Sequence, residues 1–373
     1  MRLSFNKFEH ILLNNKPIAI WCRTDIKLLK RALVLGSDKD EDLLWKKNIA
    51  NTNIFYRFFK TLFFIPKTLK YASSVKEFLK LIFIVFNFFK FKNEKILSVC
   101  YHDRNFHKIS IILSQYSPVG IMFVFGQFKN EEKVFGSNWN TFVLKKLLVP
   151  GEWFRRKIIS KGSKIAQYSQ IGAIRNAVYE IESRNIANSY KKYDLCIVSS
   201  LKKIPDNDKE YVKPTLELYA EIALIARRLN LKVCFASTVP DDAPMHSVIK
   251  KKILQVFDGQ IDYFPMSNWS TYQLTDNSEV SYGAHSSALL ETFYRGNKVI
   301  SHNPTQLPNY DFPVDGFWNI KKDSRKYFGN KFESIRAMSQ EEWDEISLKT
   351  RHDLIKNDSP SQILKSFYNC IED

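Results

Sequence analysis

The feature that most constrains the fold is a regular alternation of strand-like and helix-like segments that begins at Tyr193. Short apolar runs alternate with longer amphipathic runs, which is the pattern of a doubly wound parallel sheet with crossover helices. The expected strands are 195–199, 232–237, 261–264, 280–284 and 298–301, and the expected helices are 214–229, 244–257, 271–276 and 286–294. The second half of the chain is therefore predicted to be an α/β unit built on a parallel sheet.

Within this half, the segment 279–304 carries small residues where its helix begins. Gly283, Ser286 and Ser287 allow backbone N–H groups and hydroxyls to approach a ligand closely, and a helix N-terminus favours an anion. Glu291 follows about one turn into the helix, where its carboxylate can accept a hydrogen bond from a sugar hydroxyl. These residues indicate a site for an anion next to a sugar. A buried strand and helix with Ser as N-cap is the alternative.

Ser286-Ser287, Leu290-Glu291 and the run Arg-Gly-Asn-Lys-Val-Ile at 295–300 are together similar to a signature of GT-B glycosyltransferases, S-(S/T)-x-x-x-E-x-x-x-x-G-(K/N)-x-V-I. The resemblance is closest to transferases that build bacterial surface polysaccharide, capsule or O-antigen, and it covers roughly residues 193–318. It implies that the serine turn holds the phosphate of the donor, that Glu291 holds its ribose, and that transfer needs no metal. Two positions depart from the pattern, since Gly283-Ala284 replaces a Gly-Gly pair and His285 stands where a small residue is usual.

The loop after the 232–237 strand is expected at the same sheet edge, because the carboxyl ends of parallel strands share an edge. Ser237 and Thr238 offer hydroxyls to a phosphate or base there, with ordinary turn chemistry as the alternative. His285 or Arg295 would add positive charge. The predicted donor-binding residues are Ser237, Thr238, Gly283, His285, Ser286, Ser287 and Glu291. No metal site is predicted.

In the first half, the clearest strand is 94–101, and it ends at His102-Asp103-Arg104. Ligands gather at the carboxyl ends of strands in an open parallel sheet. Asp103 or His102 is therefore predicted to be the general base that deprotonates an acceptor hydroxyl, and Arg104 to hold an anionic group. A role as helix N-cap remains the alternative for Asp103.

The chain is strongly basic and rich in aromatic residues. Lys and Arg number 56 against 39 Asp and Glu, which gives a net charge of +17, and 14% of the residues are aromatic. This charge suits an anionic partner such as a nucleotide, a nucleic acid or an anionic membrane, and a Lys-rich coding bias is the alternative. No nucleic-acid-binding module is recognisable, so nucleic acid is not an expected partner.

Aromatic and basic residues are concentrated between Phe55 and Lys92. The longest uncharged run there, 81–89, is far shorter than the roughly twenty residues needed to cross a bilayer. Phe and Leu interleaved with Lys suit helices that lie in the interface of an anionic membrane. A second stretch of this kind is 149–157. The alternative for both is ordinary core helices whose lysines reach past apolar surface to water.

Cysteine usage and the N-terminus indicate a cytoplasmic protein. The five cysteines are widely spaced and form no C-x-x-C pair, and Cys100, Cys196 and Cys234 lie in apolar runs, as expected of buried thiols in a reducing compartment. The first residues, MRLSFNKFEHILLNNK, lack the uninterrupted apolar core of a signal peptide. We expect a cytoplasmic protein that is peripheral on the inner face of the cell membrane.

The predicted fold class is α/β, with two Rossmann-like domains facing a cleft as in GT-B proteins and with extra N-terminal aromatic and basic helices. Residues 1–188 are expected to form an acceptor-side domain with membrane-facing helices, and 189–350 a nucleotide-sugar-binding domain. Residues 351–373 are expected to form a C-terminal helix that crosses back to the first domain, by analogy with GT-B proteins. The segment 163–190 before the boundary is predicted to be one helix.

The predicted function is that of a glycosyltransferase that moves a sugar from a nucleotide-sugar donor to a lipid-linked saccharide acceptor. No cofactor is expected, because the nucleotide-sugar is the substrate. Two alternatives remain. One is a phosphotransferase that uses a CDP-polyol in the synthesis of a teichoic-acid-like polymer, and the other is a non-catalytic, membrane-recruited binding protein that keeps a transferase fold.

Overall fold

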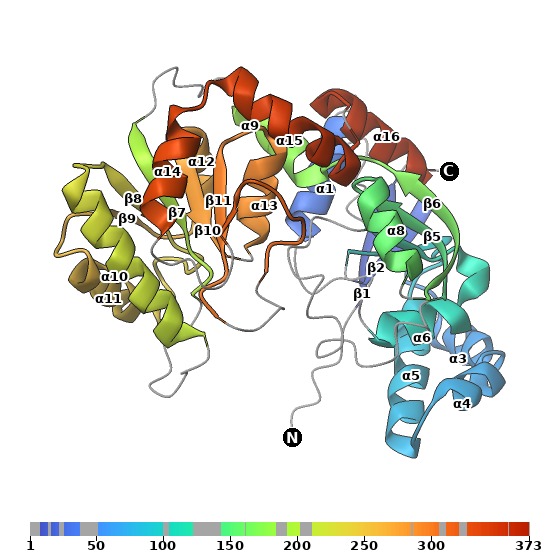
Figure 1. Ribbon diagram of the computed structural model, residues 1–373. Helices are drawn as coiled ribbons and strands as arrows, with labels where there is room; N and C mark the ends of the chain where they lie inside the picture. Colours follow the sequence, from blue (N-terminus) through green and yellow to red (C-terminus); the bar gives the residue numbers. More distant parts are fainter. Residues whose placement is uncertain are drawn as a thin grey trace. The chain divides into compact units, whose positions relative to one another are not determined.

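The chain forms two compact units, each with a largely parallel sheet at its centre (Figure 1). The computed structural model describes residues 8–13, 16–21, 26–37, 51–99, 104–121, 143–160, 162–183, 192–201, 211–284, 286–305, 311–320, 327–356 and 358–372. Unit 1 contains the described residues up to 121, those from 143 to 181 and those from 354 onward, and unit 2 contains those from 182 to 353.

The described strands of unit 1 form one sheet in the order β1-β2-β3-β4-β5-β6. They are β1 (Phe8–Leu13), β2 (Lys16–Trp21), β3 (Lys95–Ser98), β4 (Val119–Ile121), β5 (Val143–Val149) and β6 (Lys164–Gln170). β1 and β2 form an antiparallel hairpin with Ile11 opposite Ile18, and every later strand is parallel to its neighbour. The expected strand at 94–101 corresponds to β3.

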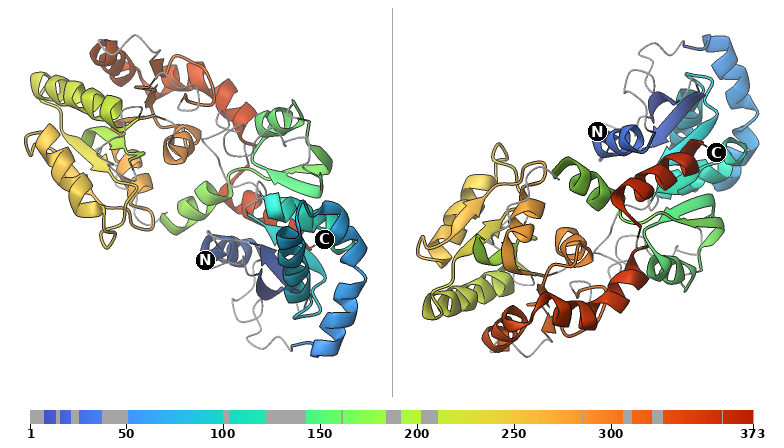
Figure 2. Two further views of the ribbon diagram at one scale, coloured as in Figure 1. Left: turned by 90° about the horizontal axis from the view of Figure 1, so that it is seen from below. Right: turned by 90° about the horizontal axis from the view of Figure 1, so that it is seen from above.

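The helices of unit 1 precede, connect and follow these strands. They are α1 (Ile26–Ser37), α3 (Ile54–Leu62), α4 (Ile65–Tyr71), α5 (Val75–Phe88), α6 (Arg104–Ile112), the short 3-10 helix η1 (Ser114–Tyr116), α8 (Glu152–Ser160) and α16 (Pro360–Glu372). α9 (Ile174–Ser183) ends two residues past the boundary with unit 2. The C-terminal helix α16 packs against α1, and both helices belong to unit 1 (Figure 2).

The prediction of a single helix at 163–190 is wrong, because a strand and a helix occupy its described part. Residues 164–170 form β6, which is paired with β5 along its length, and α9 begins at Ile174 after a turn. β6 ends the described order of the sheet, and its side chains are partly or largely exposed. Such a strand needs no buried apolar alternation, so its sequence, KIAQYSQ, lacks the usual strand pattern.

The described strands of unit 2 form a fully parallel sheet in the order β12-β11-β10-β7-β8-β9. They are β7 (Tyr193–Val198), β8 (Val233–Ala236), β9 (Asp262–Phe264), β10 (Ser278–Gly283), β11 (Val299–His302) and β12 (Asn319–Ile320). The chain runs outward from β7 to β9, returns to β10 on the other side of β7, and continues outward to β12. This confirms the expected doubly wound α/β arrangement of the second half.

The helices of unit 2 are α10 (Val212–Arg228), α11 (His246–Val256), α12 (Ser270–Asp276), α13 (Ser287–Tyr294), α14 (Phe328–Ala337) and α15 (Gln340–Leu354, whose last residue belongs to unit 1). An aromatic cluster holds α13, the segment before β12 and α15 together. The ring of Phe293 lies 4.5 Å from that of Trp318 and 6.2 Å from that of Trp343, and all three side chains are fully buried. This cluster fixes α13, which carries two of the expected donor-binding residues, Ser287 and Glu291.

The contact of α1 with α16 yields a prediction about stability. A Cβ added at Gly36 would lie far inside van der Waals distance of the backbone carbonyl of Leu364 and 3.2 Å from Cβ of Tyr368. Gly36→Ala should therefore separate the two helices and lower the free energy of unfolding by about 1–3 kcal/mol, measured by urea denaturation. The control is Gly329→Ala in α14, where the added atom has ordinary contacts at 3.4 Å or more and no loss is expected. Equal midpoints for the two variants would contradict a close α1–α16 contact.

Candidate functional site

The candidate site lies where the sheet of unit 2 reverses its direction of winding. β7 and β10 are neighbours at this point, with Gly283 paired to Val198, and the chain winds away from them in opposite directions. In open parallel sheets, ligands bind outside the carboxyl ends of the strands at such a switch point. The candidate site is therefore placed at the residues that follow Val198 at the end of β7 and Gly283 at the end of β10 (Figure 1).

Gly283 lets the end of β10 come close to both β7 and α13. A Cβ at this position would lie 3.0 Å from the carbonyl oxygen of Val198 and 3.4 Å from Cδ2 of Leu289. Any larger residue would push the turn between β10 and α13 away from the end of β7. Gly283, which the sequence analysis expected to allow a ligand to approach, thus also allows β10 to pack closely against the end of β7 and against α13.

Ser286 and Ser287 lie at the start of α13, as the sequence predicted. Ser286 occupies the N-cap position with extended backbone angles (φ −67°, ψ 132°), and its carbonyl accepts the first helical hydrogen bond from Leu290 N–H at 3.2 Å. Its side chain makes no capping hydrogen bond, which removes the hydroxyl N-cap that was the alternative. Both serines are partly exposed. The first N–H groups of a helix have no intrahelical partner and carry a partial positive charge, so this end of α13 suits an anion.

Glu291 lies one turn further along α13 and is buried, with only 1% of its surface exposed. The hydroxyl of Tyr272, in α12, donates a hydrogen bond to Oε2 of Glu291 at 2.5 Å. Burial, and secondly the nearby Glu291 carboxylate, raise the pKa of Tyr294 well above its ordinary value, so this phenol stays protonated at neutral pH. The hydrogen bond from Tyr272 thus orients the carboxylate of Glu291, one turn past the start of α13.

Arg295 lies at the opposite end of α13, where it locks α12 to α13. Its Nε donates to Oδ1 of Asp276 at 3.0 Å, its Nη2 donates to Oγ1 of Thr275 at 2.8 Å, and the guanidinium lies 4.5 Å from the centre of the Tyr272 ring. A helix of eight residues is roughly 12 Å long. The structure therefore gives Arg295 a role in positioning Tyr272 rather than a place at the start of α13.

Ser237 and Thr238 follow β8, next to the end of β7. Oγ of Ser237 accepts a hydrogen bond from Val239 N–H at 3.1 Å, and Oγ1 of Thr238 donates to the carbonyl of Leu201 at 3.0 Å. Both hydroxyls thus take part in loop structure, which is the turn chemistry held open as the alternative. The bond from Thr238 ties the loop after β8 to the loop after β7.

The loop directly after β7 was not predicted as part of the site. Ser199 and Ser200 follow the central strand, between the loops after β8 and β10, and the hydroxyl of Ser200 is hydrogen-bonded to that of Tyr211. In the sequence, the only indication of a site at this loop is that two hydroxyl residues, Ser199 and Ser200, follow an apolar run, as Ser237 and Thr238 do. The strand order, which shows that this loop is central, cannot be read from that pair.

Trp269 is the residue directly before α12. It is partly exposed, its Nε1 donates to Oε2 of Glu182 at 2.7 Å, and its ring lies edge-on to Tyr272 at 5.2 Å. The Tyr272 ring is thus bounded by Trp269 and Arg295.

The predicted base and the remaining donor residue lie outside the described part of the chain. This applies to His102, Asp103 and His285. Arg104 is the first residue of α6, but its side chain is not among the described ones. The roles assigned to these residues from the sequence therefore remain predictions.

No protein-family model matches the sequence, and no curated protein matches it. Solved structures do match. UDP-N-acetylglucosamine 2-epimerase from Rickettsia bellii superposes with a TM-score of 0.56 at 14% identity, covering 95% of each chain. UDP-GlcNAc 2-epimerase from Methanocaldococcus jannaschii, in complex with UDP-GlcNAc and UDP, superposes with a TM-score of 0.51 at 14% identity, covering 81% of this chain and 82% of that one. The chain has a GT-B fold. A glycosyltransferase from Rickettsia africae is also similar, at a TM-score of 0.47 and 9% identity.

These likenesses concern the GT-B fold alone, because the identities are so low. They agree with the two parallel α/β sheets described above. They say nothing about which side chains bind a ligand, so the site rests on the geometry of β7, β10, α12 and α13.

The bond between Tyr272 and Glu291 yields a prediction. Tyr272→Phe removes the donor to a buried carboxylate, so the free energy of unfolding should fall by about 1–3 kcal/mol, measured by urea denaturation at neutral pH. The control is Tyr327→Phe, because the Tyr327 side chain is 59% exposed in the same unit. If both variants unfold at the same urea concentration, the hydrogen bond does not hold Glu291.

Proposed function

We propose that this chain is a glycosyltransferase that moves a sugar from a nucleotide-sugar donor to a lipid-linked saccharide, in the synthesis of a bacterial surface polysaccharide such as capsule or O-antigen. It would work in the cytoplasm, bound to the inner face of the cell membrane. One observation carries the donor part of the proposal. At the switch point of a parallel sheet, α13 begins with two partly exposed serines and has a buried, tyrosine-held carboxylate one turn further on.

The chemistry of transfer explains why these groups belong together. When the bond between the sugar and the phosphate breaks, negative charge develops on the departing phosphate. Fixed N–H groups at the start of α13, with the hydroxyls of Ser286 and Ser287, would stabilise that charge without reorganisation. We assign to His285 an added hydrogen bond or positive charge at the phosphate. In this proposal no metal ion takes part.

In this proposal, donor binding uncovers the buried carboxylate of Glu291, which then accepts hydrogen bonds from the ribose. A carboxylate accepts several hydrogen bonds, so it can keep the bond from Tyr272 while it binds a ribose hydroxyl. Charge-assisted bonds of this kind are roughly twice as strong as neutral ones. The matched epimerase whose structure contains UDP-GlcNAc and UDP supports a donor of the same chemical class.

The acceptor side of the proposal rests on unit 1. Asp103 or His102 would remove the proton from the acceptor hydroxyl, and Arg104 would hold an anionic group of the acceptor. They follow β3 in the sequence, at the carboxyl end of a parallel strand, where ligands usually bind. A lipid-linked acceptor accords with the exposed apolar side chains that helices α3–α5 of the same unit carry.

A second candidate is a nucleotide-sugar epimerase, because the two structures described above, with TM-scores of 0.56 and 0.51, are UDP-GlcNAc 2-epimerases. The two activities would use the same donor site, but only the transferase requires an acceptor. An epimerase would convert a nucleotide-sugar without an acceptor, whereas a transferase would release the nucleotide only when an acceptor is supplied. NMR of the nucleotide-sugar incubated with the protein alone separates them.

The donor site can be tested by thermal-shift titration with CMP, UDP, GDP and ADP, first without metal and then with Mg²⁺. We expect a shift with one nucleotide that does not require metal, because ligand binding to the native state stabilises it. Glu291→Ala, and Glu291→Gln, which keeps the volume, should each weaken that nucleotide at least about tenfold.

The matched control is Glu279→Ala. Glu279 lies near the amino end of β10, the strand that precedes α13, and pairs with Arg336 at 2.7 Å, so its loss should leave nucleotide affinity unchanged. No shift with any nucleotide would favour a non-catalytic binding protein. A shift that persists in both Glu291 variants would remove Glu291 from the site.

The proposed base can be tested separately. If Asp103 removes the proton from the acceptor, Asp103→Asn should lower turnover at least about a hundredfold while leaving nucleotide affinity nearly unchanged. The measurement is release of the nucleotide product in the presence of acceptor, together with the thermal shift. Unchanged turnover would exclude Asp103 and leave His102 as the candidate.

A further inference from the structure

Helices α3, α4 and α5 expose an unusual amount of apolar surface. Of the 18 large hydrophobic side chains that are exposed in the described part of the chain, ten lie in these three consecutive helices and the turn between α3 and α4. We call this set the α3–α5 surface. Its members are Ile54, Phe55, Phe58, Phe59, Leu62, Phe63, Leu69, Val75, Leu79 and Phe83. α3 and α4 each pack against α5, so the helices form one group (Figure 1).

The polarity of α3 and α4 is inverted. In a helix on the surface of a soluble protein, the apolar side chains normally face the core. Here the buried residues are Thr61 in α3 and Thr68 in α4, while Phe55, Phe59 and Leu69 are 60–66% exposed. Each threonine hydroxyl donates to a carbonyl of its own helix at 2.7 Å, so its burial leaves no polar group unsatisfied.

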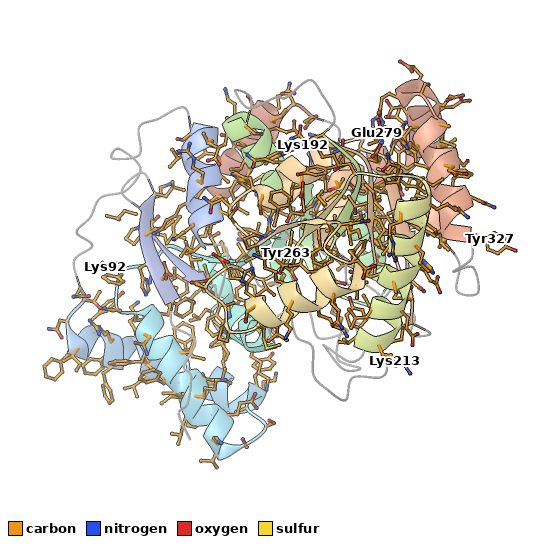
Figure 3. All side chains as sticks on the ribbon, turned by 90° about the vertical axis from the view of Figure 1, so that its left-hand side faces the viewer. Lys92, Lys192, Lys213, Tyr263, Glu279 and Tyr327 are labelled. Carbon is orange, nitrogen blue, oxygen red and sulfur yellow. The ribbon has the colours of Figure 1, made fainter. Side chains whose placement is uncertain are left out.

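α5 is apolar on both sides. Leu81, Ile84, Val85 and Phe88 are buried, and the members of the surface on this helix, three of the ten, lie on its outer side. The group is attached to the rest of unit 1 by aromatic contacts, since the ring of Phe88 in α5 lies 5.7 Å from that of Phe8 in β1 and 4.8 Å from that of Tyr116 in η1. The exposed rings are therefore carried on a fixed support. Figure 3 shows side chains projecting outward from these pale blue helices, at lower left.

The size of this surface calls for a partner. With roughly 200 Å² for each full side chain, the exposed fractions correspond to on the order of 1,000 Å² of apolar surface. Soluble monomers rarely expose a contiguous apolar patch of more than a few hundred Å². A surface of this extent marks a site that is covered in the working protein.

The charge around the surface is positive. Residues 51–92 contain eight Lys or Arg and a single acidic residue, Glu77. Glu77 is paired with Lys108 at 2.5 Å and also accepts from the backbone N–H of Ser73, so its charge is offset. The lysines at 67, 70, 76, 90 and 92 are exposed, and Figure 3 places Lys92 where the helices join the sheet.

We propose that the α3–α5 surface inserts into the interface of an anionic lipid bilayer, with its Phe and Leu side chains among the acyl chains and its lysines at the headgroups. Exposed Phe together with Lys is the pattern of helices that lie in a membrane interface. Protein interfaces, in contrast, are depleted of lysine. None of the described helices is long and apolar enough to cross a membrane. This inference deepens the peripheral location proposed above but does not depend on the chemistry of the donor site.

The other aromatic and basic stretch, at 149–157, differs from this surface. In α8, Phe154 and Ile158 are fully buried, and Arg155 pairs with Glu152 at 2.8 Å. These two side chains thus belong to the core of unit 1, which agrees with the alternative of an ordinary core helix for that stretch. Basic and aromatic composition alone does not make a membrane surface. The outward direction of the apolar side chains distinguishes α3–α5.

The test is co-sedimentation of the whole chain with vesicles of equal parts phosphatidylglycerol and phosphatidylcholine, compared with pure phosphatidylcholine. Wild-type protein should bind the anionic vesicles much more tightly. The triple variant F55S/F59S/F63S should weaken binding at least about a hundredfold, because each exposed ring contributes apolar burial. The variant K67Q/K70Q/K76Q should weaken it roughly a hundredfold, and added salt should have the same effect.

The matched control is L224S/V248S/F317S, which removes three exposed apolar side chains from unit 2 and should bind vesicles as wild type does. Because all the substituted residues are exposed, each variant should keep its circular dichroism spectrum and its thermal shift with nucleotide. Insertion is checked with F59W, whose added fluorescence should be quenched by brominated lipid.

Three results would overturn the proposal. They are failure of the wild type to bind anionic vesicles, retention of binding by F55S/F59S/F63S, and a concentration-dependent dimer, seen by ultracentrifugation without lipid, that this variant abolishes. The last would make the surface a contact between copies of the chain. Failure of nucleotide binding would instead count against the transferase and leave vesicle binding intact, so the two proposals can fail separately.

Discussion

The parallel pairing of β7 with β10 is the constraint on which the candidate site depends. These strands are separated in sequence by two strand–helix units, yet Gly283 pairs with Val198 at the centre of the sheet. The pairing brings the start of α13 beside the loops that follow β7 and β8. Since the chain winds outward on both sides, none of the described helices connects β7 directly to β10. The pairing of these two strands thus positions the candidate site and the helix terminus that suits an anion.

The buried carboxylate of Glu291 is hard to explain as a device for stability. Removing a charge from water costs several kcal/mol, and apolar side chains of similar volume are often at least as stable in such a place. The surrounding residues nevertheless hold the carboxylate in position, because Tyr272 donates to it and Arg295, paired with Asp276, packs over the Tyr272 ring. The proposed contact with ribose would give this oriented group a role in ligand binding. This reasoning favours a site, while the identity of the ligand rests on the proposal.

Local patterns in the sequence predicted the fold of unit 2 well, because strand and helix periodicity act over a few residues. All five expected strands and all four expected helices from 195 to 301 are present. What the sequence could not supply was spatial order. Ser199 and Ser200 resembled any loop until the sheet showed β7 at its centre, and Arg295, close to the serines in sequence, proved to lie at the other end of α13. The strand β6 was missed because a strand at the end of a sheet needs no buried apolar face.

The same limit explains why the Phe55–Lys92 stretch could not be settled from its composition. Apolar residues at helical spacing predict an amphipathic helix, but spacing does not say which side faces the core. In α3 and α4 the answer depends on two threonines, whose hydroxyls bond to their own helix and so allow the polar side to be buried. The aromatic side is then left in water, where it favours aggregation unless it is covered. Surrounding lysines oppose self-association by charge repulsion and at the same time attract an anionic surface. Both effects follow from the same residues, so the features that keep such a surface soluble also select a lipid bilayer as the partner that covers it.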